Sequence, residues 1–418
     1  ELLGSKMKIE LKNFEIPDID SWKNQALKES KNQHALSYIN EIENLNIDLS
    51  KKSNKYTFQT SFNAAKPNDW DIVSYHEISN SFKKNEQLIR ALEHGSNHLY
   101  LDITGSNTPW IQVFENIMLN FIHVSISFHD ENEISGFKTF LSKENEHYFT
   151  VVIDPINNDY VSFFKESNVS FMINGFSCEQ IGGSSYQQLG LIINSAEQIL
   201  QEIKKPERIK FNVGIGSHFL LETSKVRALK WLWSHLLKEN NLVTESIFIL
   251  GSTGWTNKSL KDPNMNLLRQ TTEGISGING GVSGLLIHPA SLLSQRSNNW
   301  FDTRMSLNIS HILKEESFLS KVNDPLHGSY IIEMMTEQII VNSWELFIKM
   351  QNESHTETKK NILERIEIVR SQKEKHFANG DTQLLGINLF SMESASSEYW
   401  QDIPEYLGMK FLIYENLL

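Results

Sequence analysis

The residues of this sequence that could do chemistry come singly, each directly after a short apolar run. Two of them are carboxylates, Asp102 and Asp154, and such a pair could serve as general acid and general base. Asp154 precedes Pro155, however, and an Asp-Pro pair at the end of a strand usually belongs to a turn. The other candidates at such positions are Tyr75, His129 with Asp130, Asn174, Gly214, Ile249 with Gly251 and Ser252, and His288.

The sequence predicts no metal ligands, because its 14 histidines show no HxH spacing and it has a single cysteine. Residues 129–131 are interpreted as a polar loop. Cys178 follows a strand, but no base stands beside it in sequence, so a buried structural cysteine is the favoured interpretation. The glycines of 251–254 and 280–281 could hold a phosphate through backbone N–H groups, although glycine after a strand is commonly just a turn.

Eight short β-rich runs must position these residues, and helical stretches separate the runs. Several runs are almost wholly apolar, as strands buried on both faces should be. The alternation favours parallel strands closed into a (β/α)8 barrel. A doubly wound open sheet is the alternative, but no GxGxxG motif follows the first run. The runs are 70–75, 98–103, 123–128, 148–154, 169–175, 209–215, 246–251 and 284–289.

The alternation of β-rich runs and helical stretches divides the chain into an N-terminal arm (1–66), a barrel (67–330) and a C-terminal extension (331–418). The arm either lies over the main domain, which its polar composition favours, or wraps a partner subunit. Within the arm, Asp20 is expected to cap a helix. Met7 is expected to be the native initiator, which would make the six residues before it vector-derived.

The extension begins with two charged amphipathic helices, expected over about 332–353 and 357–378. The residues after them are rich in aromatic side chains and should pack on another surface rather than extend into solvent. We expect this tail and the N-terminal arm to bury themselves on a partner chain.

Composition narrows the class of protein. The net charge is −12, which argues against nucleic-acid and anionic-membrane partners, because both require a basic face. One cysteine permits no internal disulfide, which favours a cytoplasmic location. The sequence shows neither an apolar signal core near its start nor an apolar run of membrane-spanning length.

Three long segments give the chain a family resemblance. They are GIGSHFLLETSKVRALKWLW (214–233), GSTGWTNKSLKDPNMNLLRQTTEGISGINGG (251–281) and TRMSLNISHILKEESFLSKVNDPLHGSYIIE (303–333). Together they resemble the barrel of adenosylcobalamin-dependent acyl-CoA mutases, with methylmalonyl-CoA mutase as the nearest type. The resemblance extends over about residues 65–390 and implies a (β/α)8 fold.

The departures from the family pattern fall on its reactive positions. The family's catalytic His, in an HCQTSGW loop, falls on Ile249, and its Gln falls on Gly251. The family's carboxylate-binding Arg falls near Gln201, and neither Ile nor Gln can replace the polar groups lost. The resemblance therefore implies no catalytic, cofactor-binding or metal-binding residue. It implies a degenerate pocket at Tyr75, Gln201, Ile249, Gly251, Ser252 and His288.

The family's cobalamin-binding domain holds cobalt through the His of a DxHxxG motif, which is absent here, so we expect no such domain in this chain. The resemblance then implies a non-catalytic small subunit that binds no cofactor. Its heterodimer partner would be a methylmalonyl-CoA mutase large subunit that carries adenosylcobalamin and interconverts methylmalonyl-CoA and succinyl-CoA. A homodimer is the other state open to the isolated chain. Two further hypotheses are an active barrel subunit of a split mutase with a separate cobalamin-domain chain, and a barrel that binds acyl-CoA without catalysis.

Overall fold

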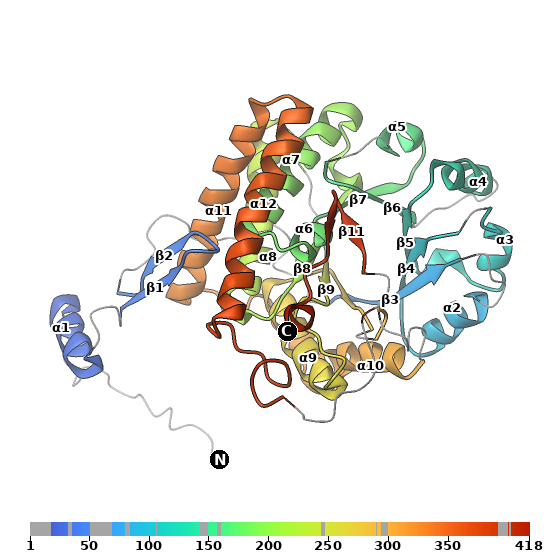
Figure 1. Cartoon of the computed structure of the whole chain (residues 1–418). Helices are drawn as coiled ribbons and strands as arrows, with labels where there is room; N and C mark the ends of the chain where they lie inside the picture. The colour runs from blue at the N-terminus through green and yellow to red at the C-terminus, as the bar shows by residue number, and fades with distance from the viewer. Residues whose placement is uncertain are drawn as a thin grey trace, which may run out of the picture.

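Eight parallel strands close into a barrel in the computed structural model (Figure 1). The order around the ring is β10-β3-β4-β5-β6-β7-β8-β9, so the (β/α)8 prediction is confirmed and the open sheet is excluded. The strands are β3 (Asp71–Ile78), β4 (His98–Ile103), β5 (His123–Phe128), β6 (Phe149–Ile153), β7 (Ser170–Asn174), β8 (Ile209–Ile215), β9 (Phe248–Thr253) and β10 (Gly284–Ile287). The structure describes residues 18–31, 36–50, 69–79, 84–105, 107–142, 149–156, 160–243, 247–289, 291–293, 300–391, 400 and 403–418.

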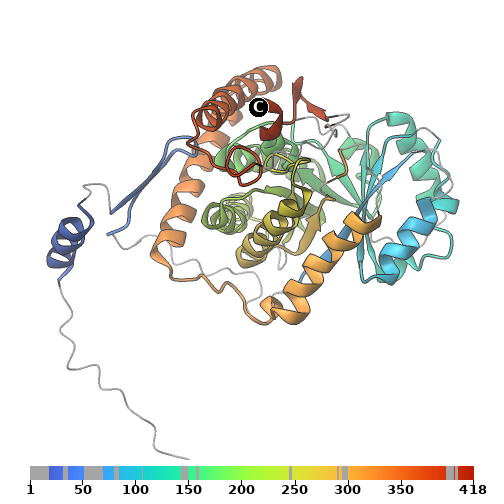
Figure 2. The same cartoon turned by 60° about the horizontal axis from the view of Figure 1, so that its bottom comes forward.

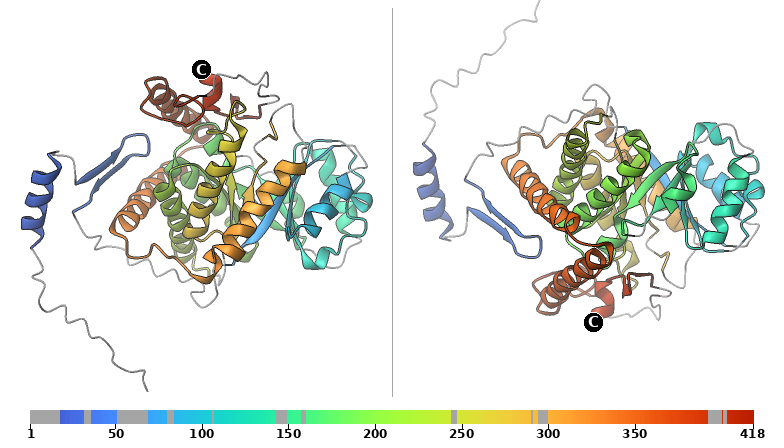
Figure 3. Two further views of the ribbon diagram at one scale, coloured as in Figure 1. Left: turned by 90° about the horizontal axis from the view of Figure 1, so that it is seen from below. Right: turned by 90° about the horizontal axis from the view of Figure 1, so that it is seen from above.

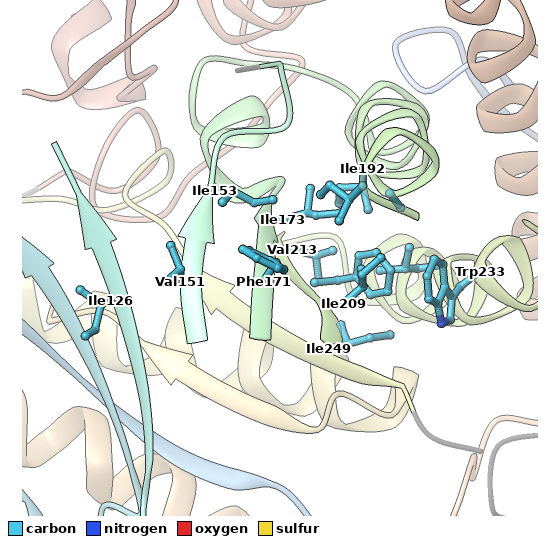
Figure 4. Close-up of a cluster of buried hydrophobic side chains, with 14 of the residues drawn as sticks. Ile126, Val151, Ile153, Phe171, Ile173, Ile192, Ile209, Val213, Trp233 and Ile249 are labelled. Carbon is cyan, nitrogen blue, oxygen red and sulfur yellow. The ribbon is translucent and has the colours of Figure 1, made fainter. Parts of the chain in front are cut away.

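Side chains alternate between two apolar layers along each strand, as the pleat of a β-strand requires. The barrel interior holds Val73, Tyr100, Val152, Met172, Leu250 and Leu286. The larger layer lies between strands and helices and includes Ile126, Phe171, Val213, Trp233 and Ile249 (Figure 4). Consecutive residues of β9 thus serve opposite layers, with Leu250 inside the barrel and Ile249 outside it.

Helices cover the outside of the ring between successive strands. Figure 2 shows α10 lying across the strands where β10 meets β3 and closes the barrel. The helices are α2 (Lys84–Glu93), α3 (Trp110–Val113), α4 (Glu131–Leu141), α5 (Tyr160–Phe164), α6 (Phe176–Gln180), α7 (Ser185–Ile203), α8 (Phe219–Glu239), α9 (Pro263–Gly280) and α10 (Trp300–His311). None of the helices in the described part of the chain is long and apolar enough to cross a membrane.

Two long helices follow the barrel, α11 (Tyr330–Gln351) and α12 (His355–Ala378), within two residues of the predicted bounds. α11 packs on α7 and α8 (Figure 1). α12 begins with a capping box, in which the side chains of Ser354 and Glu357 each bond the other's backbone N–H. The pair thickens one side of the barrel and carries the chain back toward the C-terminal ends of the strands.

The N-terminal arm contributes a helix, α1 (Ile19–Ser30), and a hairpin of β1 (Ser37–Asn40) and β2 (Leu45–Asp48). The expected cap Asp20 is wrong: Asp18 caps α1, because its carboxylate accepts from the N–H groups of Asp20 and Ser21. The hairpin lies along α11, as Figure 3 shows, so residues 36–50 lie over the chain's own main domain. Residues 1–17 and 51–66 of the predicted arm lie outside the described residues.

The C-terminal tail packs on the barrel of its own chain, so the expectation that it buries itself on a partner is wrong for residues 403–418. A small hairpin, β11 (Glu405–Tyr406) and β12 (Met409–Lys410), leads onto the mouth of the barrel, by which we mean the C-terminal ends of its strands. There Leu412 N donates to Gln180 O at 2.7 Å and Tyr414 N to Thr256 O at 3.0 Å. Phe411, Leu412 and Ile413 are buried there.

Candidate functional site

The first polar group at the mouth joins three neighbouring strands through Asp102. Tyr75 Oη donates to Asp102 Oδ2 at 2.7 Å, and His129 Nε2 lies 2.7 Å from Asp102 Oδ1. Burial, reinforced by the charge of Asp102, raises the pKa of Tyr75 well above its usual range. The hydrogen bond to Asp102 raises the pKa of His129, whose side chain is 60% exposed. Asp102 is therefore an acceptor held between two donors.

The predicted acid–base partner of Asp102 does not join it. Asp154 Oδ1 accepts from Ile156 N at 2.7 Å, which is the turn that the Asp-Pro pair favoured. Asp130 caps α4 by accepting from Asn132 N. The carboxylates of Asp154 and Asp130 therefore stabilise a turn and a helix start, and they do not flank a substrate position together with Asp102.

A second polar chain crosses the mouth through amide and hydroxyl groups. Ser252 Oγ donates to Asn212 Oδ1 at 2.7 Å, and Asn212 Nδ2 donates to Asn174 Oδ1 at 3.1 Å. Ser252 and Asn212 are buried, and the three side chains satisfy one another. Ser252 directs its hydroxyl proton to an amide oxygen, which is too weak a base to activate the serine as a nucleophile.

Aromatic rings fill the centre of the mouth around His288. The His288 ring stacks on Phe176 at 5.0 Å between centroids and lies 4.7 Å from Trp255 and 5.1 Å from Tyr75. Its Nδ1 lies 2.7 Å from Thr253 O, which fixes the proton on that nitrogen. Burial lowers the pKa of His288 to about 4, so the ring is a neutral core group at physiological pH.

The C-terminal tail covers the mouth of the barrel. The Phe411 ring lies 6.3 Å from Phe176 and 6.4 Å from Trp255, which adds a further ring to the aromatic cluster. Glu415 is buried and anchors the tail to the loop after β9. Its carboxylate accepts from Ser259 Oγ (2.6 Å), Leu260 N (2.9 Å), Lys261 N (3.2 Å) and Trp400 Nε1 (2.9 Å).

Three of the six predicted pocket positions do not face the mouth. Ile249 lies in the layer between strands and helices with Val213 and Trp233 (Figure 4). Gly251 faces the same layer, because a Cβ there would lie 2.9 Å from Val282 Cγ1. Gln201 is exposed near the C-terminal end of α7, shortly before β8 begins, and therefore at the opposite end of the barrel. Its amide donates to Glu197 Oε1 at 2.7 Å.

The candidate nucleophile and phosphate loops have structural roles. Cys178 is fully buried, and burial raises the pKa of its thiol to about 12. Gly281 has φ +84° and ends α9, a conformation that favours glycine. At Gly254, a Cβ would lie 1.7 Å from Gln180 Nε2, so a larger residue would displace the Gln180 amide that accepts from Trp255 N. These glycines shape turns and contacts rather than an anion cradle.

A polar cavity of about 220 Å³ remains beside the mouth, at the end of β8. The carboxylates of Glu179 and Glu222 and the ammonium of Lys373 line it. Burial raises the pKa of Glu179, and Lys225 Nζ, which pairs with Glu222, donates to Gly214 O at 2.6 Å. The volume lies below the about 300–1,000 Å³ of ordinary ligand pockets, which makes this cavity too small for a CoA thioester.

Sequence reasoning missed a cluster at the other end of the barrel, where the strands begin. Asp71, His98 and His123 come from β3, β4 and β5, and their ligand atoms all lie within 4.8 Å of one another. Partial burial would raise the pKa of Asp71, but the hydrogen bond from His123 and the nearby imidazole of His98 lower it overall. The sequence signal is weak: His98 and His123 each open an apolar run, and the ladder pairs them directly.

A family model described as methylmalonyl-CoA mutase matches residues 158–405, which is more than half of the chain. The chain therefore belongs to the methylmalonyl-CoA mutase family. The methylmalonyl-CoA mutase small subunit of Porphyromonas gingivalis is 33% identical over 192 residues, which is 43% of this chain and 31% of that protein. The mitochondrial methylmalonyl-CoA mutase of Bos taurus is 28% identical over 212 residues, which is 46% of this chain and 26% of the relative.

The chain thus matches less than a third of the length of these relatives. Among solved structures, dihydropteroate synthase from Thermus thermophilus aligns with a TM-score of 0.38 and 12% identity, over 59% of this chain and 94% of that one.

Proposed function

We propose that this chain is the non-catalytic small subunit of a heterodimeric adenosylcobalamin-dependent methylmalonyl-CoA mutase and that it stabilises the catalytic large subunit. The observation that carries the proposal is the closed mouth. The chain's own Phe411 and Glu415 lie where (β/α)8 enzymes hold substrate. The 33% identity to a small subunit adds support.

The described residues at the mouth do not fit a cobalamin. His288 is buried against the rings of Tyr75, Phe176 and Trp255, so a cofactor could not reach its unprotonated nitrogen without displacing these rings. The tail covers the face on which a large planar cofactor would have to lie. Adenosylcobalamin is accordingly proposed for the large subunit, and no reaction step passes through this chain. The single cysteine, buried and unpaired with another cysteine, suits a proposed cytoplasmic complex.

Co-expression with the large subunit tests the proposal. We expect the two chains to co-purify, and the large subunit alone to unfold at lower temperature and lose turnover faster. A large subunit that keeps full stability and turnover without this chain, and does not bind it, would overturn the proposal.

The two other hypotheses from the sequence are tested with this chain alone. Mixed with adenosylcobalamin, a free cobalamin-domain protein and methylmalonyl-CoA, it should form no succinyl-CoA. Titration with CoA thioesters in a calorimeter should give no heat of binding. Isomerisation would instead identify an active barrel subunit, and heat without isomerisation an acyl-CoA-binding barrel.

A further inference from the structure

The cluster of Asp71, His98 and His123 is built by three adjacent strands rather than by mobile loops. Asp71 opens β3, and the ladder places His98 of β4 directly beside His123 of β5. Asp71 Oδ2 lies 2.6 Å from His123 Nδ1 and 3.3 Å from His98 Nδ1. Both imidazoles thus turn the same nitrogen toward one carboxylate oxygen.

His98 carries a polar atom that its surroundings leave without a hydrogen bond. The residue is 0% exposed, and its Nε2 lies 2.8 Å from Ser125 Oγ. Its Nδ1 has no partner in hydrogen-bond geometry, although the Asp71 oxygen is only 3.3 Å away. A buried nitrogen that faces a carboxylate without a bond is costly, and a cation between the two atoms would satisfy both.

The Asp71–His98 spacing matches that of two ligands of one metal ion, which would replace the 2.6 Å hydrogen bond between Asp71 and His123. Two ligands that each lie about 2.0–2.1 Å from a tetrahedral Zn²⁺ are about 3.3 Å apart. The Asp71–His98 separation is 3.3 Å, whereas a hydrogen bond would be shorter and aligned. His123, whose side chain is 40% exposed, would retreat from Asp71 by a fraction of an ångström to reach the same spacing.

We propose that Asp71, His98 and His123 bind a divalent transition-metal ion, with Zn²⁺ the best match to two imidazoles and one carboxylate. Water would complete the coordination on the exposed side of His123. Ser125, bonded to the far nitrogen of His98, would orient the ring, as groups behind metal ligands usually do.

One neighbouring side chain, that of Lys210, carries a positive charge that would repel the metal ion. Lys210, at the start of β8, bonds Thr150 Oγ1 at 2.9 Å, and its charge is attracted to Asp71. A second cation so close lowers the affinity for a metal, so removing the Lys210 charge should strengthen binding. The site departs from the sequence-based expectation of no metal ligand. It is also independent of the proposed function, because it lies at the end of the barrel away from the mouth.

Metal titration of the full, tag-free chain tests the site after dialysis against a chelator. We expect one Zn²⁺ per chain by calorimetry, and Co²⁺ should give the visible absorption of a four-coordinate site. His123→Ala should weaken binding by more than about 100-fold, since losing a ligand exceeds the about 10–100-fold effect of losing an outer group. Lys210→Met should tighten binding several-fold.

His129→Ala is the matched control, because His129 also pairs with a carboxylate but lies at the mouth. It should leave Zn²⁺ binding unchanged. The proposal is overturned if the wild type binds no stoichiometric metal, or if His123→Ala binds as the wild type does. Folding of each variant is checked by circular dichroism, and the exposed position of His123 makes its alanine variant the least disruptive of the ligand changes.

Discussion

Replacing Glu415 by alanine should release the tail from the mouth of the barrel. The Glu415 carboxylate accepts four hydrogen bonds, from Ser259, Leu260, Lys261 and Trp400. Alanine removes every acceptor at once and leaves these donors facing an apolar methyl group. The tail would then be held chiefly by the packing of Phe411 and its neighbours.

The expected magnitude follows from the donors that water cannot easily reach. Hydrogen bonds to a charged group contribute about 1.5–3 kcal/mol each. We count only Ser259 Oγ and Leu260 N, both of buried residues in the loop after β9, which gives a loss of about 3–6 kcal/mol in the free energy of tail docking. Glu415→Gln should fall in between, because its amide keeps one acceptor but turns an NH2 group toward donors.

Hydrogen exchange reports the release directly. The amides of Leu412 and Tyr414 bond to Gln180 O and Thr256 O, so they are protected only while the tail is docked. Glu405→Ala is the control, since Glu405 is exposed on the same tail and its loss should change stability by no more than about 0.5 kcal/mol. Equal protection of both amides in Glu415→Ala and Glu405→Ala would refute the role assigned to Glu415.

Three further predictions concern buried groups. Ile249→His, which restores the family's residue, should lower the free energy of unfolding in urea by about 2–4 kcal/mol, because the imidazole enters an apolar layer. Ile249→Val should lower it by only about 0.5–1.5 kcal/mol. An Ile249→His variant as stable as the wild type would contradict the placement of Ile249 between strands and helices. Lys258→Met should cost about 3–5 kcal/mol, because Glu273, whose oxygens lie 2.8 and 2.9 Å from Lys258 Nζ, is left buried and charged. The double variant Lys258→Met/Glu273→Leu should recover most of that loss, and an equally unstable double variant would speak against an isolated charge as the cause. His288 has a folded-state pKa of about 4 against its ordinary 6.5, so between these values the unfolded chain binds more protons and stability falls as pH falls. Compared with His288→Phe, the wild type should lose up to about 1.4 kcal/mol more per pH unit in that window, and parallel pH profiles would remove His288 as the cause.

The fold could be predicted from the sequence because buried parallel strands have a simple signature. The runs at 98–103, 123–128 and 209–215 coincide with β4, β5 and β8. The barrel needs only that each run be apolar and that a helix follow it. The run at 246–251 was placed too early, since β9 ends at Thr253 and takes in the small polar residues interpreted as loop.

The pocket could not be predicted in the same way, because matching residues between sequences does not fix the direction of a side chain. A family histidine aligned with Ile249 suggested a lost catalytic group, but the pleat of β9 turns Leu250 and Ser252 inward and Ile249 outward. A shift of one residue in a strand exchanges its two faces. Gln201 was misplaced for a different reason: the end of a long helix lies the whole height of the barrel away from its start.

The two ends of the barrel can therefore be perturbed independently in experiment. The mouth is closed by residues far apart in sequence, such as Trp255 and Phe411, so its closure depends on the tail and should change in Glu415→Ala. The cluster of Asp71, His98 and His123 depends only on strand register, which the tail does not touch. If Glu415→Ala opens the mouth while metal affinity stays constant, the two ends act independently. If opening the mouth also altered metal affinity, strain would have to pass along β3 to β5, and the barrel would have to be treated as one coupled unit.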